Sequence, residues 1–107
     1  MRIEPTATDA VVISLAGELD LSTIPTVERG LSEQTGPAHP VIIDLTLLSF
    51  IDSSGIALLI KAFKASGGEL HTVVAEGSQV ERVFRLAGVD RALSLHLDLE
   101  AALAAAA

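Results

Sequence analysis

Residues 41–63 read VIIDLTLLSFIDSSGIALLIKAF and contain two different hydrophobic patterns. The stretch begins with a largely apolar run, Val41–Leu45, which is typical of a central strand with neighbours on both edges. It ends with apolar residues at i, i+3, i+4 and i+7 from Ile56, which is the spacing of an amphipathic helix. The polar tetrapeptide DSSG at 52–55 therefore lies between a strand and the N-terminus of a helix.

Strands and helices alternate along the rest of the chain as well. A turn at 8–10 joins the first two predicted strands into an antiparallel hairpin. Ser22 is the expected N-cap of the first helix, and residues 36–40 (GPAHP) are a loop by composition. Besides the strand that begins at Val41, strands are predicted at Arg2–Pro5, Val11–Ala16, Glu69–Ala75 and Leu93–Leu95. Besides the helix that contains Ile56, helices are predicted at Thr23–Glu33, after Ser78 and after Asp98.

This order of elements predicts the fold class. Alternating strands and helices require right-handed crossovers and give a mostly parallel sheet. We expect a single α/β domain over residues 1–107, with a mixed sheet of four to five strands, an N-terminal antiparallel hairpin and helices packed on the sheet. Residues 101–107 are expected to form a frayed tail.

The composition excludes several classes of function. The chain has no cysteine, so disulfides, iron–sulfur clusters and Cys-ligated zinc are excluded. A formal charge of −7 without clustered Lys or Arg argues against a nucleic acid or an anionic membrane as the partner. No apolar run reaches the ~20 residues that span a bilayer. We therefore expect a cytoplasmic protein with a protein partner, no cofactor and no metal site.

The DSSG segment at 52–55 has two interpretations on its own residues. One carboxylate and two hydroxyls could simply cap the first turn of the helix, which is worth about 1 kcal/mol. No capping box forms, however, because Ile56 is the third residue after Ser53, so one hydroxyl exceeds what a cap requires. A serine at a helix N-terminus is also a favourable site for a phosphate, whose charge the helix dipole stabilises.

Five segments of the sequence are similar to the motifs of one known family. They are Gly17–Asp20 (GELD), Val41–Leu45 (VIIDL), Phe50–Gly55 (FIDSSG), Gly67–Leu70 (GGEL) and Val83–Gly88 (VFRLAG). Since they are spread over nearly the whole chain, the protein resembles a STAS domain of the bacterial anti-sigma factor antagonist family.

The resemblance implies a regulatory binding protein rather than an enzyme. In that family the antagonist binds an anti-sigma factor that is also a serine kinase, and thereby releases a sigma factor. The kinase phosphorylates the serine that follows the aspartate of the motif, and a protein phosphatase removes the phosphate. By motif position that residue is Ser53, with Ser54 as a less favoured acceptor. Asp20, Asp52, Ser53, Ser54 and Gly55 are then the expected partner-binding residues.

Two other functions fit the residues less well. A serine hydrolase would need a G-x-S-x-G elbow, but no glycine lies two residues before Ser53. The histidines give no further support, since His39 falls in a predicted loop, His71 in a predicted strand and His96 near the C-terminus. A phospho-receiver would use Asp20, Asp44 and Asp52 to hold Mg²⁺, but Asp44 lies inside its strand, where a loop or cap contact is the expected role.

A third alternative keeps the fold and changes the partner. STAS domains also occur as accessory subunits of transport and lipid-trafficking complexes and of stress-signalling assemblies, and the fold alone does not choose among these roles. The serine that follows Asp52, in a chain without a predicted membrane-spanning segment, favours the anti-sigma pathway.

Overall fold

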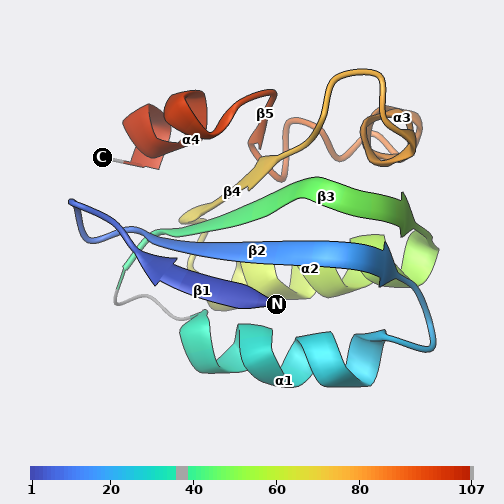
Figure 1. Cartoon of the computed structure of the whole chain (residues 1–107), viewed down its shortest axis with the longest axis horizontal. Helices are drawn as coiled ribbons and strands as arrows, with labels where there is room; N and C mark the ends of the chain where they lie inside the picture. Colours follow the sequence, from blue (N-terminus) through green and yellow to red (C-terminus); the bar gives the residue numbers. More distant parts are fainter. Residues whose placement is uncertain (36–38, 107) are drawn as a thin grey trace.

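The computed structural model describes residues 1–35 and 39–106. In these ranges five strands form one mixed sheet in the order β1-β2-β3-β4-β5 (Figure 1). β1 pairs with β2 antiparallel, and the other neighbours are parallel, which confirms the predicted hairpin and mostly parallel sheet. The strands are β1 (Arg2–Pro5), β2 (Val11–Leu19), β3 (Val41–Ile51), β4 (Leu70–Val73) and β5 (Leu95–His96).

Three helices cover one face of the sheet and a fourth covers part of the other. Successive right-handed crossovers in one direction place their helices on the same face, and the main core cluster joins that face to the first three helices. The fourth helix packs on the opposite face through the buried Ala102, against Val12 and Ile42. The helices are α1 (Ile24–Gln34), α2 (Ser53–Ala65), α3 (Gln79–Leu86) and α4 (Leu99–Ala106) (Figure 1).

β3 is longer than its apolar run predicts, because its second half follows a different pattern. Leu45, Leu48 and Ile51 are buried at every third position, and the residues between them are exposed. The register with β2 shifts twice along this half, as expected for bulges. The Asp44 carboxylate supports the first shift by accepting hydrogen bonds from the backbone N–H and the hydroxyl of Thr46, at 2.9 and 2.7 Å. This is the local structural role expected for Asp44.

β2 also runs on past its predicted end at Ala16. Gly17 adopts a φ of +88°, which residues with a side chain rarely adopt, and its carbonyl oxygen accepts a hydrogen bond from the Ser49 hydroxyl at 2.9 Å. This irregularity keeps the strand paired with β3 as far as Leu19. The two longest strands therefore end side by side.

Two expectations about helix ends are wrong. Ser22 does not cap α1; it donates its hydroxyl to the Asp20 carboxylate, and Thr23 is the N-cap residue. Residues 101–106 are not a frayed tail but most of α4, whose Ala102 is buried. The small alanine side chains let this helix approach the sheet closely, and the Asp98 carboxylate accepts from the Ala101 N–H at 2.7 Å.

The remaining differences are small. β4 is shorter than predicted, and β5 begins at Leu95 because Ser94, with a φ of +47°, is not extended. Residues 36–38 of the predicted loop, and residue 107, lie outside the described residues.

Candidate functional site

The two loops that contain the predicted site residues meet at one edge of the sheet. Leu19 and Ile51 are register partners at the ends of the parallel strands β2 and β3. Asp20 and Asp52 therefore leave the sheet side by side, at the carboxyl ends of the strands, where sites gather in α/β sheets. The backbone N–H of Asp52 donates to the Leu19 carbonyl oxygen at 3.3 Å and ties the two loops together.

Asp52 is the N-cap of α2, as its position at the strand–helix join predicts. Its backbone is extended, with φ −116° and ψ −174°, and its carboxylate accepts a hydrogen bond from the Gly55 N–H at 3.1 Å. Ser53 is the first residue of the helix and is exposed, and Ser54 is half-buried. Since the carboxylate performs the capping, the Ser53 hydroxyl is not required for it.

We expect the contribution of this cap to be measurable by mutation. Asp52→Ala should lower the free energy of unfolding by about 1 kcal/mol, because the Gly55 N–H loses its partner. Asp52→Asn is the matched control and should stay within a few tenths of the parent, since asparagine caps about as well as aspartate. Urea unfolding of both variants measures the difference. An equal loss in Asn and Ala variants would show that charge, not capping, stabilises this turn.

Gly55 is buried where α2 meets the ends of β2 and β3. A Cβ atom on Gly55 would lie 2.6 Å from Ile51 Cγ1 and 2.8 Å from the Leu19 carbonyl oxygen. Only glycine therefore permits the helix N-terminus to lie this close to the sheet. The close approach fixes where Ser53 is presented.

Asp20 organises the other loop. Its Oδ1 atom accepts from the Ser22 hydroxyl at 2.7 Å, from the Ser22 N–H at 2.9 Å and from the Thr23 N–H at 3.2 Å. The hydrogen bond from the Ser22 hydroxyl is the main cause that lowers the pKa of Asp20 below its usual value, and the two backbone N–H groups lower it further. The carboxylate is thus ionised at neutral pH and holds the loop in one shape.

Two exposed apolar side chains lie beside these loops, and the sequence analysis did not include them among the expected site residues. Leu21, next to Asp20, is 76% exposed, and Phe50, two residues before Asp52, is 39% exposed. The sequence contains one signal for Leu21, since an apolar residue inside the polar turn DLST has no core to enter. The sequence contains no such signal for Phe50, because the exposure of its side chain results from the irregular register of β3.

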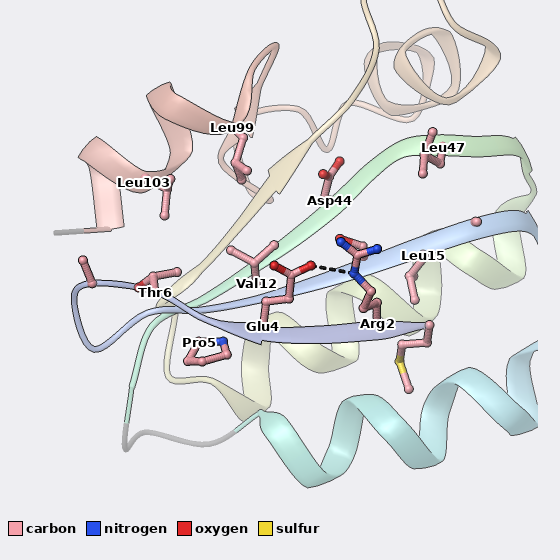
Figure 2. A pocket seen from close by; sticks show the side chains of 14 residues that line it. Arg2, Glu4, Pro5, Thr6, Val12, Leu15, Asp44, Leu47, Leu99 and Leu103 are labelled. Atoms are coloured by element: carbon pink, nitrogen blue, oxygen red, sulfur yellow. Dashed lines mark hydrogen bonds and ion pairs between the residues drawn. The ribbon is translucent and has the colours of Figure 1, made fainter.

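A hollow of about 710 Å³ lies elsewhere, on the sheet face that α4 partly covers (Figure 2). Figure 2 shows Asp44 and Leu47 of β3 on one side of it, Leu99 and Leu103 of α4 on another, and an ion pair between Arg2 and Glu4 of β1. Asp44 lines this hollow, whereas Asp20 and Asp52 do not. The three aspartates considered for a Mg²⁺ site therefore do not share a pocket.

The other candidate groups also lie away from Ser53. His71 of β4 and His96 of β5 contact each other, with Nδ1 and Nε2 3.2 Å apart, and burial, assisted by His96, lowers the pKa of His71.

Over residues 1–35 and 39–106, no three His, Cys, Asp or Glu side chains are arranged to hold a metal ion. Nor does any helix in the same ranges combine the length and apolarity needed to cross a membrane.

Comparison with known proteins gives one consistent family. The model of the STAS domain matches residues 2–102. An anti-sigma-B factor antagonist of Listeria monocytogenes is 34% identical over 87 residues, which are 80% of this chain and 75% of that protein. The anti-sigma-F factor antagonist RsfB of Mycobacterium tuberculosis is 32% identical over 94 residues, covering 86% and 77%.

Solved structures agree in fold. An anti-sigma factor antagonist from Mycobacterium paratuberculosis superposes with a TM-score of 0.86 at 26% identity, covering 98% of this chain and 91% of that one. The phosphorylated form of the Bacillus cell fate determinant SpoIIAA gives a TM-score of 0.64 at 26% identity, with 97% of both chains covered.

Proposed function

The chain belongs to the STAS domain family, and we propose that it is an anti-sigma factor antagonist whose partner binding is switched by phosphorylation of Ser53. The observation that supports this most directly is the position of Ser53: exposed, first in α2, beside a separate capping carboxylate and next to the Asp20 loop. The relatives at 32–34% identity are named anti-sigma factor antagonists. Those names favour this role over an accessory subunit of a transport, lipid-trafficking or stress-signalling complex.

The binding surface in this proposal consists of Asp20, Leu21, Phe50, Asp52, Ser53 and Ser54, and we call it the switch surface. It combines exposed apolar side chains with two carboxylates. A partner with a basic or charge-balanced docking face would bury the former and pair with the latter. Gly55 is buried and does not contact the partner; it contributes by allowing the N-terminus of α2 to lie close to the sheet.

Phosphorylation would alter this surface without unfolding it. The anti-sigma factor, acting as a kinase, transfers the γ-phosphoryl group of ATP: an Oγ–P bond forms at Ser53, the bond from phosphorus to the leaving ADP oxygen breaks, and the hydroxyl proton is released. The product carries about −1.5 to −2 charges at neutral pH. The helix N-terminus stabilises these charges, whereas the Asp52 carboxylate repels them, and the bulk of the phosphate obstructs docking at this position. A phosphatase that hydrolyses the ester with water restores the binding-competent form. Since the kinase reaction consumes ATP, this proposal includes a cytoplasmic location.

The test is phosphorylation followed by binding. The parent is incubated with ATP and the anti-sigma kinases encoded in the same genome. It should incorporate one phosphate, at Ser53. It should bind its kinase before phosphorylation and lose that binding afterwards. Ser53→Ala should take up none and remain bound, whereas Ser54→Ala, the matched control, should behave like the parent. Ser53→Glu should bind about 5- to 150-fold more weakly, the usual range of such couplings. Mass spectrometry and calorimetry measure both effects.

Two results would contradict the proposal. If no anti-sigma kinase of that genome phosphorylates the parent, the chain acts with another partner. If Ser53→Glu binds as tightly as the parent, added charge at this position does not block docking.

A further inference from the structure

The side chain of Gln79, the first residue of α3, pairs with the backbone of Ile51. The Ile51 N–H donates to Gln79 Oε1 at 3.0 Å, and Gln79 Nε2 donates to the Ile51 carbonyl oxygen at 2.9 Å. One amide side chain thus satisfies both backbone groups of one residue, as a neighbouring strand would. The two residues are 28 apart in the sequence.

This pairing occurs where the sheet lacks a strand. β4 pairs with β3 only from Val41 to Asp44. Along the second half of β3, the edge away from β2 has no strand partner within the described part of the chain. Ile51 is buried, and buried backbone groups must be hydrogen-bonded. Gln79 meets that requirement at the last residue of the strand.

α3 holds Gln79 firmly in this position. The Ser78 hydroxyl caps the helix by accepting from the Glu81 N–H at 3.1 Å, and the Glu81 carboxylate accepts from the Gly77 N–H at 2.7 Å. Val80 and Phe84 are fully buried in the core. The amide of Gln79 is therefore presented by a helix that is fixed at its first turn.

The Asp52–Ser53 turn is consequently held from two sides. On one side, the Asp52 N–H bonds to Leu19 of β2. On the other side, Gln79 holds Ile51, directly before Asp52. Without Gln79, both backbone groups of Ile51 would lose these hydrogen bonds, and backbone hydrogen bonds would hold the turn on the β2 side alone.

We propose that Gln79 is a positioning residue for the phosphorylation switch, holding the Asp52–Ser53 turn where Ser53 can receive a phosphoryl group. This inference rests on the proposed function. Group transfer requires the attacking oxygen about 3–3.5 Å from phosphorus and in line, and a displacement of about 1 Å can reduce the rate 100-fold. The Asp20 loop is held by its own hydrogen bonds to Ser22 and Thr23, so docking depends less on Gln79.

The test compares Gln79→Met with Gln34→Met. Methionine keeps the shape of glutamine and removes both hydrogen bonds. Gln34 is the last residue of α1, a helix that packs on α2 and β2. At a temperature where all proteins are folded, Gln79→Met should lower the kcat of Ser53 phosphorylation about 10- to 100-fold and change KM by less than about threefold. Hydrogen exchange of the Ile51 amide should accelerate, and the NMR shifts of Asp52 and Ser53 should move. Gln34→Met should change none of these.

The outcomes separate this inference from the proposed function. If the parent takes up no phosphate, the proposed function fails, and the exchange rate of Ile51 still decides whether Gln79 holds the turn. If the parent is phosphorylated and Gln79→Met keeps the kcat of the parent, the positioning role is overturned, whatever the exchange rate of Ile51. Should Gln79→Met not fold, Gln79→Glu retains the acceptor for the Ile51 N–H and loses the donor; a kcat equal to that of the parent would overturn the role.

Discussion

Replacing Phe84 by alanine is expected to lower the free energy of unfolding by about 3–5 kcal/mol. The Phe84 ring is fully buried in the core cluster between α3 and the sheet. Its removal forfeits the burial of an aromatic side chain and leaves a cavity that the neighbours only partly close. Domains of this kind are stable by about 5–15 kcal/mol, so the loss is a large fraction of the total. Urea unfolding monitored by circular dichroism measures it.

Leu86→Ala is the matched control on the same helix. Leu86 is 88% exposed, so its truncation should change the stability by no more than about 0.5 kcal/mol. If the two variants lost the same stability, Phe84 would not be the residue that anchors α3. Because α3 begins at Gln79, we also expect Phe84→Ala to slow phosphorylation of Ser53 under conditions where the variant is folded.

Gly55→Ala is expected to destabilise the protein by about 1–3 kcal/mol, the usual cost of overpacking. Alanine is ordinarily preferred to glycine in a helix by up to about 1 kcal/mol. At this position, however, the new methyl group would lie 2.8 Å from the Leu19 carbonyl oxygen and 2.6 Å from Ile51 Cγ1. A backbone oxygen in a paired strand cannot move aside easily, so α2 must shift away from the sheet. Thermal unfolding should show a lowered midpoint.

Gly30→Ala provides the control for the same exchange in α1. Its methyl group would meet only the terminal atoms of the Met1 side chain, which is 55% exposed and can move. This variant should be as stable as the parent or up to about 1 kcal/mol more stable. A Gly55→Ala protein as stable as Gly30→Ala would mean that the N-terminus of α2 does not require its close approach to β2.

Much of the fold could be predicted because local patterns and the architecture agree. The apolar run at Val41, the helical spacing from Ile56 and the cap at Asp52 each depend on neighbouring residues, and all three are present in the structure. The tail prediction was wrong for a definite reason. Residues 101–106 are all alanine or leucine and show no amphipathic stripe, yet the buried Ala102 packs them against the sheet.

The site was only partly predictable. The motif predicted Ser53 and Asp20 as site residues, and the parallel pairing of β2 with β3 brings the loops that contain them together. The exposure of Phe50 could not be foreseen, because it follows from bulges after which β3 is buried only at every third residue. The pairing of Gln79 with Ile51 joins residues 28 apart, and no spacing rule connects them.

By itself, the sequence determined which residues form the strand–turn–helix around Asp52 and which hydroxyl follows the capping carboxylate, because hydrogen bonds within one turn depend on adjacent residues. Only the tertiary structure decided how that turn is held: β2 at one side through Leu19, Gln79 at the other, and a buried Gly55 beneath. These contacts depend on how far each strand extends and where its neighbour ends. Such quantities are properties of the packed sheet and not of any single segment.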